Sequence, residues 1–265
     1  METIPIRAWS SQRGKLIVEN KGVRINKYIA ECGYCSRRDA DKLIEKTAVI
    51  VNGRPATPGM KVTDRDDIKI NGKPINAPAR KVVLAYYKPL GVVCTSRDKH
   101  AEVTVYDNLK YPNRLTYAGR LDKESEGLLL MTNDGDLIDA MMRGANHHEK
   151  EYLVKVNKPL NDEALEHMRT GVYLKELELT TRECEIIQTG TYTMKMILTQ
   201  GVNRQIRRMC HAVGYEVRSL KRTRVINIQL GDLKPGEYRE LTDAELQALY
   251  NECSNTTTKG YIKYV

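Results

Sequence analysis

Residues 117–135 have the sequence Tyr117-Ala-Gly-Arg-Leu-Asp-Lys-Glu-Ser-Glu-Gly-Leu-Leu-Leu-Met-Thr-Asn-Asp-Gly135. A polar turn around Asp122, just after Arg120, leads into the strongest apolar run of the neighbourhood, at residues 128–132. The run predicts a buried strand, and the turn fixes one carboxylate at the edge of that rigid element. Reactive side chains are usually held in this way, although aspartate also caps ordinary turns. Asp122 is therefore a candidate catalytic residue whose role depends on the rest of the chain.

The 265 residues are 41% hydrophobic and 29% charged, a composition that suits a globular protein with one large and one small domain. No apolar run approaches the roughly 18 residues that a membrane helix needs. Residues 1–22 also lack the apolar core of a signal peptide. We therefore expect a cytoplasmic protein that makes no contact with a membrane.

Six cysteines are scattered along the chain, and without an export signal we expect them to be reduced thiols. Cys32 and Cys35 form a CxxC pair, but no second pair or ordered pair of histidines completes a zinc site. The two thiols are predicted to pack in the interior, and no metal site is expected.

The distribution of charge predicts a polyanionic partner. The net charge is +9, and residues 21–80 alone hold thirteen Lys and Arg against seven Asp and Glu. Between Arg204 and Arg224 lie seven basic residues and the single acid Glu216. Two separate basic clusters favour a nucleic-acid backbone that runs over the protein.

The first cluster is predicted to be a small module of two helices and short strands. Ile25, Tyr28 and Ile29 form an apolar stripe, and Ser36 followed by Asp39 predicts the cap of a second helix. Two strand pairs should follow, each turning on an Asn-Gly dipeptide, within 49–54 and 67–73. The predicted segments are an extension at 1–22, this module at 23–80, a larger domain at 81–253 and a tail at 254–265.

The larger domain is predicted to be α+β with a mixed, mostly antiparallel sheet, because strands outnumber helices and do not alternate regularly with them. The apolar patterns predict strands at 82–87, 92–95, 152–156 and 192–199. Helices are predicted at 134–142, ending near Gly144, and at 161–170 with Asn161 as its cap.

A further helix is predicted within 200–214, with one apolar and one basic face. Arg207 lies at the seam between these faces, where a guanidinium can reach a partly enclosed carboxylate. Arg204 and Arg208 are expected to point outward to phosphates, and His211 to belong to the same face rather than to catalysis. A solvated surface helix is the structural alternative.

The module at 23–76 resembles the S4-type RNA-binding domain. The motifs that carry the resemblance are Arg24-Ile-Asn-Lys-Tyr-Ile, Cys35-Ser-Arg-Arg-Asp-Ala-Asp and Val51-Asn-Gly-Arg-Pro. The resemblance implies that RNA binds the helical face, next to a strand turn, through Lys27, Arg37, Arg38, Asn52 and Arg54. A basic helical hairpin without a ligand is the alternative.

From about Val23 to Leu249 the chain resembles the RsuA-type ribosomal RNA pseudouridine synthases, especially the RluF-like members. The motifs are Lys88-Pro-Leu-Gly, Gly119-Arg-Leu-Asp122, His148-Glu-Lys-Glu-Tyr152-Leu-Val and Gly201-Val-Asn-Arg-Gln-Ile-Arg207. The resemblance implies that Asp122 is the nucleophile and that Arg207 forms an ion pair with it. It also implies that Tyr152 stacks on the target base and serves as general base, and that Arg120 holds the flipped nucleotide. It implies ribosomal RNA as the substrate, 23S first and a transfer RNA second, with no cofactor.

The expected chemistry suits these residue types. Making pseudouridine breaks an N-glycosidic bond and re-forms it through carbon, which requires a nucleophile and a base but no redox centre. A neighbouring arginine favours an ionised carboxylate, and flipping the uridine costs a few kcal/mol that stacking and phosphate contacts offset. Whether Asp122 attacks the sugar or the base stays open, as does the identity of the uridine. We expect a monomer.

Two alternatives come from other classes of protein. An S4-containing methyltransferase would need a glycine-rich loop for its methyl donor, and the chain contains no GxGxG sequence. A non-catalytic S4-containing factor that binds the ribosome would keep the basic faces, but it has no need of Asp122, Tyr152 and Arg207 together.

Overall fold

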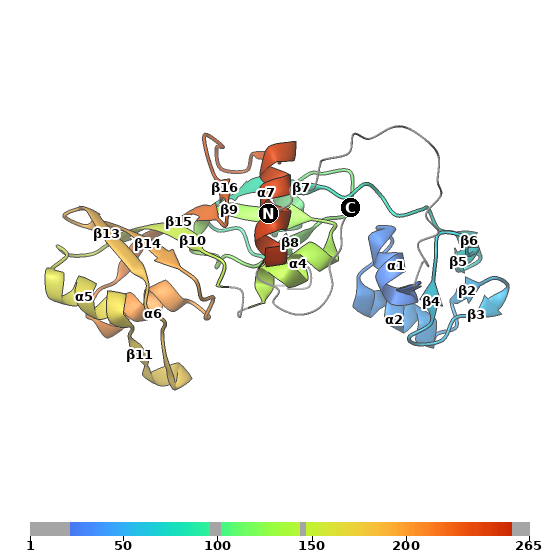
Figure 1. Ribbon diagram of the computed structural model, residues 1–265, viewed down its shortest axis with the longest axis horizontal. Coiled ribbons are helices and arrows are strands. Elements are labelled where there is room, and N and C mark those ends of the chain that lie inside the picture. Colours follow the sequence, from blue (N-terminus) through green and yellow to red (C-terminus); the bar gives the residue numbers. More distant parts are fainter. Residues whose placement is uncertain (1–21, 96–101, 144–146, 256–265) are drawn as a thin grey trace, which may run out of the picture. The chain divides into compact units, whose positions relative to one another are not determined.

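The computed structural model describes residues 22–95, 102–143 and 147–255, and the chain divides into two compact units, Met1–Pro78 and Ala79–Val265 (Figure 1). The predictions for the N-terminal extension, the C-terminal tail and Gly144 fall wholly or almost wholly outside the described residues. The four segment limits drawn from the sequence remain predictions. None of the helices in the described part is long and apolar enough to cross a membrane.

The first unit joins two helices to short antiparallel strands, in the sheet order β3-β2-β5-β6 with β1 paired to β4. Its elements are β1 (Val23–Arg24), α1 (Ile25–Glu31), α2 (Arg37–Glu45), β2 (Val49–Val51), β3 (Arg54–Pro55), β4 (Lys61–Val62), β5 (Ile68–Ile70) and β6 (Lys73–Pro74). Both Asn-Gly turns have positive φ, with Asn52 at 50° and Asn71 at 49°. Asn and Gly tolerate this backbone geometry. The two predicted hairpins are confirmed, since β2 pairs with β3 and β5 pairs with β6.

The predicted helix cap and apolar stripe of this unit are also present. The Ser36 hydroxyl accepts a hydrogen bond from the Asp39 backbone N–H at 3.1 Å, which starts α2. Ile25, Tyr28 and Ile29 are buried in a core shared with the strands. The charged faces of the helices are thereby left outside.

The second unit is built on a nine-stranded sheet with the order β13-β14-β10-β15-β9-β7-β17, to which β8 and β16 are added through β9 and β15. Its strands are β7 (Val83–Lys88), β8 (Thr116–Ala118), β9 (Glu126–Thr132), β10 (Lys150–Val156), β11 (Tyr173–Leu174), β12 (Leu179–Thr180), β13 (Glu185–Gly190), β14 (Thr193–Leu198), β15 (Val217–Val225), β16 (Ile228–Gln229) and β17 (Tyr238–Glu240). Its helices are α3 (Val105–Asn108), α4 (Gly135–Met142), α5 (Asp162–Thr170), the 3-10 helix η2 (Lys175–Leu177), α6 (Gln205–Ala212) and α7 (Asp243–Asn255). Every pairing between these strands is antiparallel except β9 with β15, which confirms the predicted α+β class and mixed sheet.

The strand predicted at 92–95 is wrong. Among the described residues, only one bridge, between Val93 and Thr104, forms there. The partner segment cannot continue as a strand, because the Thr104 side chain accepts a hydrogen bond from the Asp107 backbone N–H and caps α3.

The sheet has two halves, each with its own helices (Figure 1). Strands β10, β13 and β14 share a core with α5 and α6, whereas β7 and β9 pack against α4 and α7. The halves meet at β15, which touches β9 through only two residue pairs, Lys221 with Glu126 and Arg222 with Gly127. A short parallel contact therefore joins the two halves of the domain.

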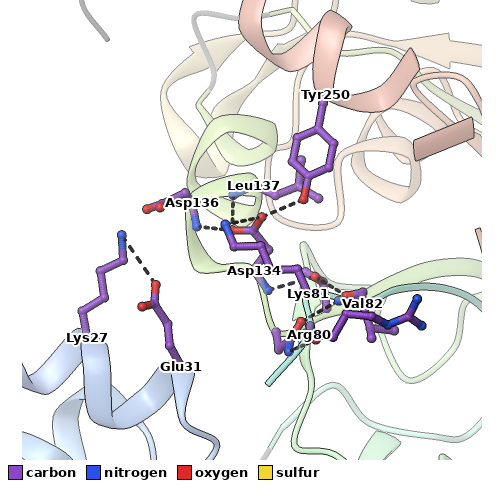
Figure 2. A network of polar contacts seen from close by, with 11 residues as sticks. Lys27, Glu31, Arg80, Lys81, Val82, Asp134, Asp136, Leu137 and Tyr250 are labelled. Atoms are coloured by element: carbon purple, nitrogen blue, oxygen red, sulfur yellow. Dashed lines mark hydrogen bonds and ion pairs between the residues drawn. The ribbon is translucent and has the colours of Figure 1, made fainter. Parts of the chain in front are cut away.

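Asp134 ties the helices of the second half to the start of β7 (Figure 2). Its carboxylate caps α4 and accepts the Tyr250 hydroxyl of α7 at 2.7 Å, and it pairs with the Lys81 ammonium at 3.0 Å. Burial acts to raise the pKa of this carboxyl, but these donors lower it overall. The carboxylate therefore remains ionised inside the protein.

We predict that Gly127→Ala severely destabilises the protein. Gly127 has φ of +106°, and a Cβ there would lie 2.3 Å from the Arg222 carbonyl oxygen. Strained backbone and overpacking each cost about 1 to 3 kcal/mol, so urea unfolding should show a loss on the order of 3 kcal/mol. Gly135→Ala is the control, since nothing lies within 4 Å of its added Cβ. Equal stability of the two variants would contradict the prediction.

Candidate active site

A cavity of about 540 Å³ opens at the junction of the two half-sheets, close to the contact between β9 and β15. Most of its lining comes from four segments: the loop 119–125, the start of β10, the loop 200–204 with the start of α6, and the middle of β15. Val93, Cys94, Met142 and Leu198 complete it. The cavity is therefore bounded by the turn that precedes β9 and by both halves of the domain.

The Asp122 turn is held in place from two sides. The Ser125 backbone N–H donates to the Asp122 carbonyl at 3.1 Å, and the Gly91 N–H donates to the Lys123 carbonyl at 2.8 Å. Leu121 is buried, Asp122 is half-buried, and both line the cavity, as does the exposed Arg120. The structure thus places one carboxylate on a rigid turn that faces an open space.

Tyr152 and Arg222 lie opposite each other on β10 and β15. Directly paired residues of antiparallel strands have side chains on the same face of the sheet, and both of these line the cavity. Tyr152 is half-buried and packs against the apolar clusters of both half-sheets. Its ring is well supported for stacking against a planar ligand.

Arg222 is a cavity residue that the sequence interpretation missed. It is 3% exposed, and its Nε donates to the Leu128 carbonyl at 2.7 Å. Its buried Nη2 has no hydrogen-bond partner among the described residues. One feature of the sequence could have revealed its burial: Arg222 lies two residues after Leu220, which is buried. On a strand this spacing places both side chains on the same inner face. The sequence interpretation counted Arg222 only as part of the basic cluster.

The predicted pairing of Arg207 with Asp122 is wrong within the part of the chain that the structure describes. Arg207 is half-buried at the seam of α6, as predicted, but its Nη2 donates to the Glu124 carbonyl at 2.5 Å and its Nη1 to the Val217 carbonyl at 3.2 Å. These carbonyls lie on the loop that carries Asp122 and on β15. The side chain therefore clamps the loop to the sheet instead of meeting the carboxylate.

Arg204 and Arg208 both meet glutamates. Arg204 Nη1 pairs with the Glu124 carboxylate at 2.6 Å, and this hydrogen bond lowers the pKa of Glu124. Arg208 pairs with Glu176, while its Nε donates to the Asn203 carbonyl at 3.1 Å. Arg204 lines the cavity, whereas Arg208 does not.

The predicted RNA-binding residues of the first unit differ in their surroundings. Arg37 and Arg38 are exposed in the first turn of α2, and Arg54 is exposed on β3. Lys27 pairs with Glu31 at 3.7 Å along α1 (Figure 2). Asn52 instead shapes its own turn: its amide donates to the Asp66 carboxylate at 2.8 Å and accepts the Asp67 N–H at 2.9 Å.

Cys32 and Cys35 are half-buried and pack against the core of the first unit, which confirms the predicted packing. Burial raises the pKa of the Cys32 thiol to about 11, so this thiol is protonated at neutral pH. Within residues 22–95, 102–143 and 147–255, no three His, Cys, Asp or Glu side chains form a group that could hold a metal.

Two lysines add positive charge close to the cavity. Lys88 is fully buried, and its Nζ donates to the Pro89 and Val92 carbonyls at 2.8 and 2.7 Å. Burial lowers the pKa of Lys88, although the negative charge of Asp122 acts to raise it. Lys150 lines the cavity, and burial together with the nearby Arg222 lowers its pKa to about 8. These cations and Arg222 create a positive field suited to an anionic substrate.

We predict that Lys150 titrates near pH 8. Its unfolded pKa is about 10.4, so between these values the unfolded chain binds more protons and the contribution of Lys150 makes stability rise with pH. Competitive acetylation of the folded protein from pH 6 to 11 measures the pKa directly. Arg222→Leu should raise that pKa, because it removes a like charge. A pKa above 10 in the unmutated protein would contradict the assignment.

Comparisons with known proteins agree with this geometry. The RNA pseudouridylate synthase family matches residues 82–212, and the S4 domain family matches residues 23–68. The dual-specificity RNA pseudouridine synthase RluF of Shigella flexneri is 42% identical over 246 residues, which are 92% of this chain and 84% of that protein. The ribosomal large subunit pseudouridine synthase B of Bacillus subtilis (strain 168) is 35% identical over 232 residues, 85% of this chain and 95% of that one.

A solved structure supports the same relationship. The crystal structure of a pseudouridylate synthase matches with a TM-score of 0.64 and 28% identity, covering 86% of this chain and 99% of that chain. The predicted family is confirmed, and it is preferred to the two alternatives, an S4-containing methyltransferase and a non-catalytic factor. The chain belongs to the RNA pseudouridine synthases, enzymes that isomerise uridine in RNA, and carries an S4 domain before its catalytic domain.

Proposed function

We propose that this enzyme isomerises a uridine of ribosomal RNA in the cavity lined by Asp122, Tyr152 and Arg222, and that it acts as a monomer in the cytoplasm. The observation that carries the proposal is that one cavity brings together a carboxylate on a rigid turn, a supported aromatic ring and a buried arginine. Large-subunit RNA is the first candidate, because the Bacillus subtilis relative is named for it. A transfer RNA is the second, since the Shigella relative is named as having dual specificity.

The reaction exchanges one glycosidic bond for another. The N1–C1′ bond breaks, the C5–C1′ bond forms, N1 gains a proton and the C5 proton is lost. Asp122 is the nucleophile in this proposal, and attack on either C1′ or the base uses the same carboxylate. In this proposal Tyr152 stacks on the flipped uracil and accepts the C5 proton. Arg120, exposed on the rim, holds the phosphate of the flipped nucleotide.

Arg222 replaces Arg207 as the proposed electrostatic partner of Asp122. Its unpaired and buried Nη2 is an unsatisfied donor in a cavity that contains a carboxylate. A buried charge without a partner is costly, and Asp122 with its negative charge supplies the missing partner. Arg207 keeps an indirect role, because it fixes the carbonyl of Glu124, two residues beyond Asp122.

The S4 unit is proposed to hold RNA around the target. Arg37 and Arg38 combine their charges with the free N–H groups at the start of α2, which favours phosphate. Lys27 and Arg54 extend this basic surface in the proposal. Asn52 contributes by keeping the neighbouring turn in shape, given its hydrogen bonds to Asp66 and Asp67.

We predict that Asp122→Asn abolishes turnover but not binding. The amide keeps the shape of the side chain and removes its nucleophilic charge, so the rate should fall at least about a thousandfold. Tritium release from RNA labelled at C5 of uridine measures turnover, and filter binding measures affinity. Retention of a tenth of the wild-type rate would refute the assignment.

We predict that substitutions of Arg222 and Arg207 have different effects on the rate. Arg222→Met removes a donor that is preorganised at the reacting groups, and the single-turnover rate should fall about 100-fold or more. Arg207→Met loosens the loop and should lower the rate by about 10-fold. Circular dichroism checks folding, and Arg222→Lys, which keeps the charge, should restore part of the rate. A larger loss for Arg207→Met would return the partner role to Arg207.

A further inference from the structure

A second hollow of about 520 Å³ lies between α6 and the hairpin formed by β11, η2 and β12. It belongs to the second unit and lies outside the cavity that Asp122 and Tyr152 line. The residues that give it its chemical character are Tyr173, Glu176, Arg204, Arg208 and His211.

The hollow combines an exposed aromatic ring with positive charge. Tyr173 is 58% exposed and lies at the base of the hairpin. Four Lys and Arg side chains line the hollow against two Glu. Unpaired nucleic acid is bound by this combination, in which bases stack on aromatic rings and cations follow the phosphates.

Arg208 is already engaged with an anion in the hollow. Its Nε is fixed by the Asn203 carbonyl at 3.1 Å, and its guanidinium pairs with the exposed Glu176 carboxylate. Arginine binds carboxylates and phosphates with the same planar geometry. A phosphate can therefore replace the Glu176 carboxylate on Arg208.

Arg204 connects the hollow to the active site, because it lines both spaces. It pairs with Glu124 at 2.6 Å, on the loop that carries Asp122. An RNA strand that leaves the flipped uridine can thus pass over Arg204 to reach Tyr173 and Arg208. This continuity favours RNA over an acidic protein segment as the occupant.

We propose that the hollow binds an unpaired nucleotide next to the target uridine, with its base on Tyr173 and its phosphate on Arg208 in place of Glu176. The inference rests on the proposed function, since it assigns a second contact to the same RNA. It gives the enzyme a means of selecting targets whose flanking nucleotide can unstack.

The experiment compares three variants of the full chain on unmodified large-subunit ribosomal RNA made by in vitro transcription. Glu176→Gln removes the competing charge and should lower the Kd about threefold to tenfold. Tyr173→Ala removes the stacking surface and should raise the Kd about tenfold. Glu166→Gln is the matched control: Glu166 is exposed and pairs with Arg169 at 3.2 Å on α5, outside both spaces.

The control separates a local effect from a general one, because both Glu→Gln changes add one unit of positive charge. Equal affinities for Glu176→Gln and Glu166→Gln, together with wild-type affinity for Tyr173→Ala, would overturn the inference. Cross-linking of RNA that contains 4-thiouridine should label the peptide around Tyr173 in the wild type. If polyglutamate, and not RNA, binds Glu176→Gln more tightly than the control, an acidic protein segment is the occupant and the RNA assignment is wrong.

The same samples test the proposed function separately. Tritium release by the wild type together with unchanged RNA binding by the variants would refute the role of the hollow and leave the proposed function intact. No release from this RNA by the wild type would refute ribosomal large-subunit RNA as the substrate, whatever the variants bind.

Discussion

The contact between β9 and β15 is the constraint on which the active site depends. Two residue pairs join the half-sheets there, and the main chain of Arg222 approaches Gly127 so closely that a Cβ has no room. The Arg222 side chain then reaches the Leu128 carbonyl at 2.7 Å. One close approach therefore sets the position of the buried arginine and of the strand that begins just after the Asp122 turn. Any displacement of β15 would move the arginine and the carboxylate relative to each other, and reaction geometry is sensitive to such movement.

The loop that carries Asp122 is held by main-chain acceptors more than by its own side chains. Gly91 donates to the Lys123 carbonyl, Arg207 to the Glu124 carbonyl, and Ser125 to the Asp122 carbonyl. This arrangement leaves the Asp122 carboxylate available to the cavity, while the polypeptide around it is fixed. The role of nucleophile proposed for Asp122 needs both properties, since a mobile carboxylate loses the advantage of orientation.

Much of the fold could be predicted because its signals are local. Ser36 and Asn161 each cap the helix that follows, and both Asn-Gly dipeptides form the expected turns. The sequence interpretation failed where a partner was decided by tertiary contacts. A helical projection places Arg207 at a seam, but it does not reveal that carbonyls face that seam. The strand expected at 92–95 failed for a similar reason, because its partner begins a helix at Thr104. Tyr152 and Asp122 do share the cavity, although their roles rest on the proposal.

Burial separates the functions of chemically identical arginines. Arg222 is removed from water and has an unused donor, so its charge acts strongly on whatever anion enters the cavity. Arg204 and Arg208 are more accessible and pair with glutamates. Ion pairs of this kind contribute little to stability, so the cost of exchanging a glutamate for a phosphate is small. Binding through them is consequently reversible and sensitive to salt, whereas the interaction at Arg222 is protected from it. In the proposed mode of binding, an enzyme that must release a long RNA after changing one nucleotide benefits from this difference, because weak exchangeable contacts at Arg204 and Arg208 hold the strand while the field of Arg222 acts on the flipped uridine.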